Sequence, residues 1–248
     1  MARGVTRLYL SAPDCGPAET AAVARAVESG WVAPLGPEVD AFEREIAAFA
    51  ERAVGVALSS GTAGLHLCLL AMGVGVGHEV VVPTLTFGAT AFAVNYVGAQ
   101  PVFLDVESES WNLDPALLAE FLSARAAIGK LPAAVVTVDV FGYPCDYDSI
   151  MQVCSEFGVP VLEDAAEALG AWHLSKPAGA FGHAGVFSFN GNKIMTTSGG
   201  GVVVTDDADG ELNWFGQALP GRAQACLEGG GCPALELRRA REGALAVA

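Results

Sequence analysis

The chain alternates short apolar runs rich in β-branched residues with helical stretches, and this order constrains its fold more than any other feature. The runs lack a period of two, which is typical of strands that are covered on both faces. They fall at residues 54–58, 80–82, 102–104, 135–138, 159–162 and 202–204. The sequence therefore predicts an α/β fold with a mostly parallel central sheet and helices on both faces.

Helical patterns precede and separate these runs, often with Pro near the start or Gly at the stop. They cover residues 17–30, 37–49, 63–72, 89–97, 115–122 and 147–157. From about Asp207 onward there is no strand pattern, and a run of three glycines interrupts any helix. We expect one large domain over residues 1–206 and an atypical, poorly organised tail over 207–248.

Composition limits the classes of partner. The 248 residues are 52% hydrophobic, enough for a sizeable core, and carry a net charge of −15. Such an acidic chain has no basic stripe to release phosphate counterions, which argues against general binding to nucleic acid or anionic membranes. A phosphate group could still be bound locally by backbone amides and hydroxyls.

The cysteines and histidines predict neither disulfides nor a metal site. No two of the six cysteines form a CxxC pair, and no secretory segment opens the chain, so we expect reduced thiols in a cytoplasmic protein. The four histidines lack ligand spacing. Polar residues and Pro break the most apolar regions every few residues, so we expect no transmembrane helix.

Ligands of such sheets bind at the carboxyl ends of the strands, where several polar segments lie. The segment Ser59-Ser60-Gly61-Thr62-Ala63 follows the first apolar run and opens a helix. Free amides and the helix dipole suit a phosphate there, and Gly61, Thr62 and Ala63 are the candidate cradle. The structural alternative is an ordinary strand-to-helix turn in which Ser60 or Thr62 serves as N-cap.

Two further segments supply an aromatic ring and a carboxylate. Phe87 follows the run at 80–82 and could stack on a flat cofactor ring, although a core phenylalanine is the alternative. Asp164 follows the run at 159–162, where a buried carboxylate needs a cation such as a protonated pyridine nitrogen. Its alternative is a helix N-cap. Glu163 is expected to face away, and Glu167 could reach the ring hydroxyl of the same cofactor.

The last segment carries Lys193, one of three lysines in the chain, on the polar turn Ser188-Phe189-Asn190-Gly191-Asn192-Lys193. A lysine amine can hold an aldehyde cofactor as a Schiff base, although most lysines are simply solvated. The Ser188 hydroxyl could meet the cofactor phosphate, and Asn190 and Asn192 supply polar contacts on the turn. The joint order of phosphate turn, aromatic, acid and lysine predicts a pyridoxal 5'-phosphate (PLP) site.

These segments resemble the DegT/DnrJ/StrS-type family of sugar aminotransferases, which have the fold type I PLP architecture. The resemblance covers roughly residues 8–207. It is carried by Ser29-Gly30-Trp31, Gly36-Pro37, Phe42-Glu43, Ser60-Gly61-Thr62, Pro83-Thr84, and the segments 163–167 and 188–193. It implies a contact with the cofactor for seven of the candidate residues. The assignments are Lys193 to the Schiff base, Asp164 to the pyridine nitrogen, Phe87 to the ring face, Glu167 to the ring hydroxyl, and Thr62, Ala63 and Ser188 to the phosphate.

The resemblance also implies a reaction. An amino donor, usually glutamate in this family, would leave its amine on PLP, and a keto group of a nucleotide-linked deoxysugar would collect it, in a homodimer. One branch of the family has histidine in place of the lysine and removes a hydroxyl, so Lys193 favours transamination. The C-terminal domain of the family is not recognisable after Asp207. A catalytically incomplete or regulatory remnant, and another PLP reaction such as sugar dehydration, therefore remain alternatives.

Overall fold

The computed structural model describes residues 14–32 and 36–207 of the chain. Two compact units divide it, the first ending at Ala41 and the second beginning at Phe42. The first unit contains helix α1 (Pro17–Glu28) and the start of α2 (Pro37–Phe49). In α1, Pro17 occupies the first turn and the Glu19 carboxylate accepts a hydrogen bond from the Gly16 amide. The predicted tail lies, except for Asp207, outside the described residues.

The second unit is built on a seven-stranded sheet with the strand order β1-β9-β8-β5-β4-β2-β3. Its strands are β1 (Val54–Leu58), β2 (Glu79–Pro83), β3 (Gln100–Leu104), β4 (Ala134–Val138), β5 (Val161–Asp164), β8 (Ala184–Ser188) and β9 (Gly201–Thr205). The pairs among β3, β2, β4, β5 and β8 are parallel, and β9 is antiparallel to both neighbours. The predicted mostly parallel sheet is confirmed.

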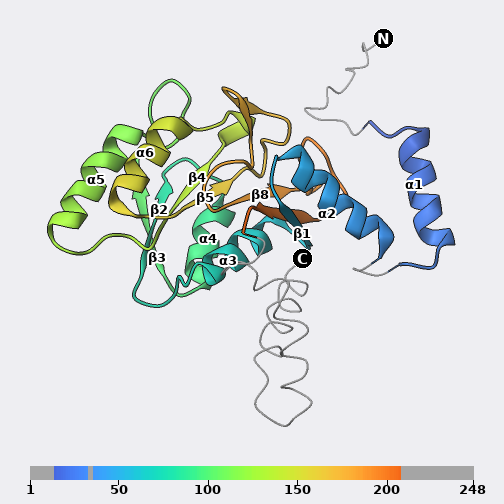
Figure 1. Cartoon of the computed structure of the whole chain (residues 1–248), viewed down its shortest axis with the longest axis horizontal. Helices are drawn as coiled ribbons and strands as arrows, with labels where there is room; N and C mark the ends of the chain where they lie inside the picture. The colour runs from blue at the N-terminus through green and yellow to red at the C-terminus, as the bar shows by residue number, and fades with distance from the viewer. Residues whose placement is uncertain (1–13, 33–35, 208–248) are drawn as a thin grey trace, which may run out of the picture. The chain divides into compact units, whose positions relative to one another are not determined.

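Helices cover both faces of this sheet, as the sequence predicts (Figure 1). Helices α3 (Gly61–Ala71) and α4 (Gly88–Tyr96) pack on one face through a cluster that includes Leu69, Val94 and Val186. Helices α5 (Pro115–Ala127) and α6 (Tyr147–Phe157) pack on the other through Leu122, Ile150 and Val161. The inner strands β2, β4, β5, β8 and β9 are thus buried on both sides, which explains why they read as continuous apolar runs, whereas the edge strands β1 and β3 are only partly buried.

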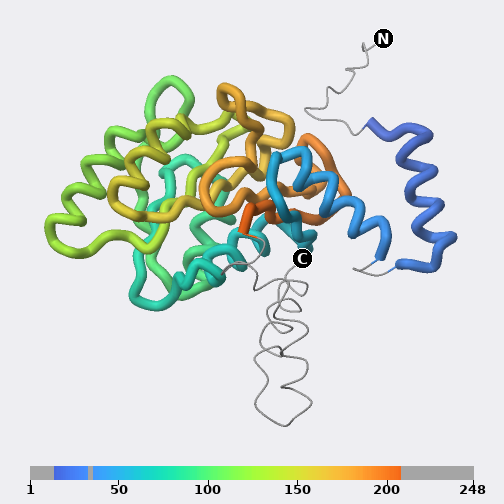
Figure 2. Tube along the Cα trace, viewed as in Figure 1, coloured from blue at the N-terminus to red at the C-terminus, as the bar shows by residue number. Residues whose placement is uncertain are grey.

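Strand β9 returns the chain between β1 and β8, so the last described strand lies beside the first (Figure 2). Helix α3 packs closely on β8 and β9. A Cβ atom added at Gly64 would lie 2.8 Å from Val186 Cγ1 and 3.2 Å from Val203 Cγ2. The glycine therefore permits the close helix–sheet approach that fixes the start of α3 at the carboxyl end of β1.

The structure shifts one predicted strand and adds small elements. Strand β5 covers 161–164 rather than 159–162, because backbone pairing with β4 continues through Glu163 and Asp164. A short antiparallel hairpin, β6 (Trp172–His173) and β7 (Lys176–Pro177), follows β5. A 3-10 turn, η1 (Val140–Gly142), follows β4. The shift matters because it places both carboxylates inside the sheet rather than beyond it.

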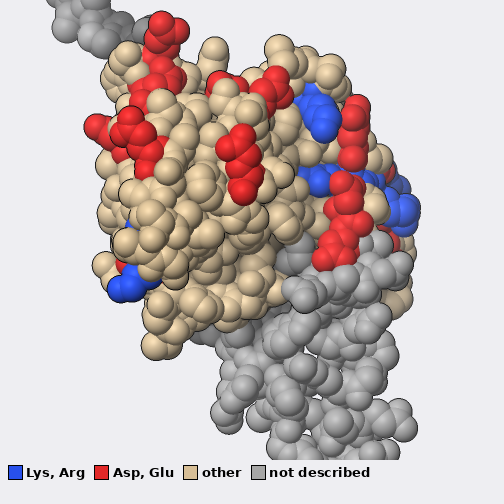
Figure 3. Space-filling view, turned by 60° about the vertical axis from the view of Figure 1, so that its left-hand side comes forward, with Lys and Arg blue, Asp and Glu red and all other residues tan. Residues whose placement is uncertain are grey.

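The surface charge and the cysteines can be described for residues 14–32 and 36–207. On the face shown in Figure 3, acidic side chains are widely spread and basic ones are few. Within these residues, no helix is long and apolar enough to cross a membrane, and no group of three or more His, Cys, Asp or Glu residues could hold a metal ion. The described cysteines are all free thiols: Cys15, Cys68, Cys145 and Cys154.

Candidate active site

The candidate site lies at the edge of the sheet where β1, β2, β5 and β8 end. At the end of β1, Ser60 has extended backbone angles and caps α3, its Oγ accepting a hydrogen bond of 3.1 Å from the Ala63 amide. Gly61 and Ala63 are buried, and Thr62 is half-buried. The amides of Gly61 and Thr62 belong to the first helical turn, which has no intrahelical acceptors. The turn therefore offers free donors and the positive end of the α3 dipole.

Ser188, at the end of β8, lies directly against this turn. A Cβ atom added at Gly61 would be 3.0 Å from Ser188 Cβ and 3.4 Å from Ser188 Oγ. Gly201 faces the turn from β9, and a Cβ there would come within 2.5 Å of the Gly61 amide nitrogen. The absence of side chains at Gly61 and Gly201 thus lets β8 and β9 pack closely against the turn, and it brings the Ser188 hydroxyl beside it.

Lys193 follows β8 on a compact turn. The Lys193 amide donates to the Asn190 carbonyl at 3.0 Å, and the Thr197 amide donates to the Phe189 carbonyl at 3.0 Å. The Phe189 amide in turn donates to the Gly200 carbonyl at 2.9 Å. These bonds fix the backbone of the turn, so the lysine projects from an ordered base. The Asn190 amide group instead donates to Asn192 Oδ1, and both asparagines are exposed.

The lysine amine meets two other predicted residues. Lys193 Nζ forms an ion pair of 2.8 Å with Glu167 Oε1, and it lies 5.9 Å from the centroid of the Phe87 ring. The Lys193 side chain is only 10% exposed, whereas Phe87 is 79% exposed. Phe87 is therefore not a core residue. Its ring, at the N-cap of α4, leaves a face open beside the amine.

Asp164 is buried at the end of β5 and turns toward α4. Its Oδ2 accepts a hydrogen bond of 2.7 Å from the Thr90 hydroxyl, and its Oδ1 accepts one of 3.2 Å from the Ala166 amide. Burial raises the pKa of Asp164, while these two bonds and the charge of Lys193 oppose the rise. The carboxylate and the amine thus belong to one electrostatic neighbourhood.

Sequence reasoning missed Thr90, which orients this carboxylate. The Thr90 hydroxyl also meets that of Thr86 at 2.7 Å, four residues earlier in the chain. Thr86 precedes Phe87, the N-cap of α4, and so lies outside the helix; helical spacing therefore does not predict this pair. The role of Thr90 can be recognised only when Asp164 is known to face α4.

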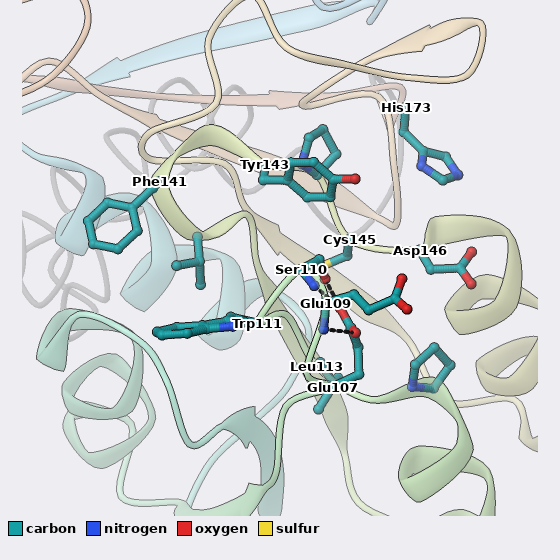
Figure 4. Close-up of a pocket in the computed structure, with 13 residues that line it drawn as sticks. Glu107, Glu109, Ser110, Trp111, Leu113, Phe141, Tyr143, Cys145, Asp146 and His173 are labelled. Carbon is teal, nitrogen blue, oxygen red and sulfur yellow. Dashed lines mark hydrogen bonds between the residues drawn. The ribbon is translucent and has the colours of Figure 1, made fainter.

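A separate cavity of about 750 Å³ opens between the loops that follow β3 and β4 (Figure 4). Trp111, Phe141 and Tyr143 supply aromatic walls, and Glu107 and Asp146 supply carboxylates. None of the predicted cofactor residues lines it. The candidate site at the strand ends is therefore separate from this cavity.

The donor set fits PLP. A phosphate needs convergent amides and a hydroxyl, which the α3 turn and Ser188 provide. A protonated heterocycle needs a buried, oriented carboxylate, which Asp164 provides. An aldehyde cofactor needs an amine and a flat ring needs an aromatic face, which Lys193 and Phe87 provide 5.9 Å apart at the same edge of the sheet.

Comparisons with known proteins then decide the family. The sequence model of the DegT/DnrJ/EryC1/StrS aminotransferase family matches residues 13–214 of this chain. The chain belongs to this family. It is 43% identical over 201 residues to the "Putative pyridoxal phosphate-dependent aminotransferase EpsN" of Bacillus subtilis, with 81% of this chain and 52% of that protein covered. Members of the family use PLP.

Solved structures of the aminotransferase family share the fold. A DegT DnrJ EryC1 StrS aminotransferase from Brucella abortus matches with a TM-score of 0.76 at 35% identity, covering 82% of this chain and 54% of the other. DesI, solved in the presence of its TDP-sugar product, matches with a TM-score of 0.72 at 38% identity, covering 87% and 52%. The chain spans about half the length of the relatives it matches.

Proposed function

We propose that this chain carries the cofactor-binding part of a PLP-dependent aminotransferase. The reaction would move an amino group, with glutamate as the donor, to a keto group of a nucleotide-linked deoxysugar. One observation carries the proposal: the Lys193 amine lies between Glu167 and the Phe87 ring and within electrostatic reach of buried Asp164. The TDP-sugar named with DesI supports the substrate class.

Each residue has a distinct task in this proposal. PLP would supply an aldehyde that carries the amino group and a heterocycle that withdraws electrons. Lys193 Nζ would bind the aldehyde and, once released, would move the proton between the amine-bearing carbon of the substrate and the former aldehyde carbon of the cofactor. Its ion pair with Glu167 holds the amine at the edge of the sheet. Asp164 would stabilise a proton on the ring nitrogen, oriented by Thr90.

The remaining candidates would bind and orient the cofactor. The first turn of α3, with Gly61, Thr62 and Ala63, and the Ser188 hydroxyl would bind the phosphate. Phe87 would cover one face of the ring. Asn190 would contact the cofactor from the turn, although its amide group bonds to Asn192 in this structure. These assignments separate binding of the phosphate from the chemistry at Lys193.

An amine-transfer assay tests the function. The purified 248-residue chain, supplied with PLP, glutamate and a TDP- or GDP-linked 4-keto-6-deoxysugar, should produce the amino sugar and 2-oxoglutarate. Lys193→Ala should abolish both products. Lys130→Ala, which changes an exposed lysine outside the candidate site, should not. Binding of PLP without transfer would favour an incomplete or regulatory protein. Release of a deoxygenated sugar would favour dehydration.

Assembly and location belong to the same proposal. Family resemblance supports a homodimer, and the free thiols Cys68, Cys145 and Cys154 fit a cytoplasmic protein. Light scattering coupled to size-exclusion chromatography would measure the mass of the assembly. A monomeric mass would contradict the dimer.

A further inference from the structure

Two buried carboxyl groups face each other on the side of the sheet away from Asp164. Asp139, directly after β4, is 1% exposed, and Glu163, in β5, is fully buried. Asp139 Oδ1 accepts hydrogen bonds from the Tyr147 hydroxyl at 2.8 Å and from the Cys145 amide at 3.0 Å. Strands β4 and β5 pair in parallel, which places the two acids beside one another at the strand ends.

Glu163 is held from the opposite direction by the loop that precedes β8. The Gly179 amide donates to Glu163 Oε1 at 2.5 Å, and the Phe181 amide donates to Oε2 at 2.9 Å. The Arg52 guanidinium supports the same loop through the carbonyls of Gly179 and Phe181. Both Glu163 oxygens are therefore fixed by backbone that is itself anchored.

One oxygen in this cluster lacks a donor. Asp139 Oδ2 is buried and receives no hydrogen bond from any residue within the described ranges. A buried acceptor without a donor costs about 1–3 kcal/mol, and the loss is larger for a charged group. Glu163, the acid beside Asp139 in the paired strands, helps to lower the pKa of Asp139 through a hydrogen bond, and it can donate that bond only when it carries a proton. We propose that Asp139 and Glu163 share a single proton and thereby position Asp164 at the end of β5.

Charges around the pair are consistent with one retained proton. Burial and the charge of Asp139 raise the pKa of Glu163 well above its ordinary value, and Arg52 opposes the rise. Burial raises the pKa of Asp139 to about 6. Tyr147 and Cys145, the other titratable groups that face the pair, are neutral when protonated, and His173 packs beyond Tyr147. Arg52 is itself paired with Asp206.

The pair is coupled to the candidate active site through the backbone. Glu163 precedes Asp164, and the Asp139 amide donates to the Asp164 carbonyl at 3.1 Å. Two facing negative charges would separate the ends of β4 and β5, whereas a shared proton joins them. Asp139 and Glu163 are thus positioning residues. The role of Asp164 that they support rests on the function proposed above.

An isosteric substitution tests the shared proton. In Asp139→Asn, the amide oxygen can accept from Tyr147 and Cys145, and the amide nitrogen can donate to an ionised Glu163. The variant therefore keeps every hydrogen bond and the net charge of the pair but has no proton to lose. Asp139→Ala removes the bonds. Asp146→Asn makes the same chemical change at an exposed cap of α6 and serves as the control.

Denaturant titration of the cofactor-free full chain at several pH values around neutrality measures how the unfolding free energy depends on pH. This dependence gives the number of protons that the chain takes up on folding. A raised folded pKa means that folding takes up a proton, so stability falls as pH rises toward that pKa. We expect the unfolding constant of the wild type to rise about tenfold more per pH unit than that of Asp139→Asn. Asp146→Asn should keep the wild-type slope. Equal slopes in the wild type and Asp139→Asn would overturn the shared proton.

Hydrogen exchange at the Asp139 and Ala166 amides tests the positioning. Exchange should accelerate in Asp139→Ala and return to the wild-type rate in Asp139→Asn, whereas equal rates in all three proteins would overturn the role. If the asparagine variant does not fold, infrared spectra of the wild type at neutral pH must still show a protonated carboxylic acid that is absent from Glu163→Ala. None of these readouts requires PLP, so failure of the proposed aminotransferase function would be seen separately.

Discussion

The two consecutive acids of β5 are both removed from water, but different kinds of partner stabilise their carboxyl groups. Glu163 and Asp164 are both buried, on opposite faces of one strand. Glu163 meets two backbone amides and another acid, and it has no cation in direct contact in the described structure. Asp164 meets a hydroxyl, one amide and the charge of Lys193. The comparison suggests that one acid is kept for structure and the other for a positively charged ligand.

Replacing the Asp164 carboxylate by an amide should have the largest effect on activity. Asp164→Asn retains partners for Thr90 and Ala166 but loses the charge that a protonated ring nitrogen requires. We expect amine transfer to fall about a hundredfold or more, as when other transition-state electrostatic contacts are removed. The unfolding free energy of the cofactor-free protein should not fall, because burial disfavours this charge. Steady-state kinetics and denaturant titration measure the two effects.

The same amide substitution at Asp139, which lies beside Glu163 on the opposite face, should leave amine transfer nearly unchanged. Asp139→Asn leaves the charge of Asp164 unchanged, so amine transfer should stay within a few-fold of the wild type. A hundredfold loss in Asp139→Asn, or none in Asp164→Asn, would show that the two faces are not divided between structure and chemistry.

Packing at the start of α3 supports the cofactor side, and its loss should have the next largest effect. Gly64→Ala would bring a methyl group within 2.8 Å of Val186 Cγ1. Such overpacking costs about 1–3 kcal/mol. Gly75→Ala, where the nearest atom is 3.9 Å away, is the matched control. Thermal unfolding should separate the two variants, and equal stability of Gly64→Ala and Gly75→Ala would contradict the close helix–sheet contact.

Capping of α3 should have the smallest effect on stability but a specific one on binding. Ser60→Ala removes the bond to the Ala63 amide, a loss of about 1 kcal/mol. Asp114→Ala removes a similar cap from α5, on the opposite face of the sheet. Both should destabilise the fold to a similar degree, but only Ser60→Ala should weaken PLP binding in a fluorescence titration. Equal PLP binding by the two variants would contradict the proposal that the α3 turn binds the phosphate.

The sequence predicts the fold well because buried parallel strands leave a hydropathy signal. The run at 54–58 coincides with β1, whereas β5 is displaced by two residues because its charged end is paired but not apolar. The β6–β7 hairpin has two-residue strands and leaves no pattern. Short strands are fixed by tertiary contacts, which a sequence pattern does not contain.

The sequence predicts some residues of the candidate site but not others. Motif order brought Lys193, Asp164, Phe87 and the α3 turn to one edge of the sheet, where the structure also places them. Thr90 and Asp139 were not recognised, because each acts through another residue rather than through a motif. Their roles depend on which face of β5 each acid occupies, and only the register of the sheet fixes that.

Mapping the site of reductive attachment tests the central claim most directly. The full chain is incubated with PLP, reduced with borohydride, digested and analysed by mass spectrometry. The account predicts one modified peptide, with the phosphopyridoxyl group on Lys193 and loss of the label in Lys193→Ala. Labelling of Lys130 or Lys176 instead, or no visible absorbance before reduction, would contradict it.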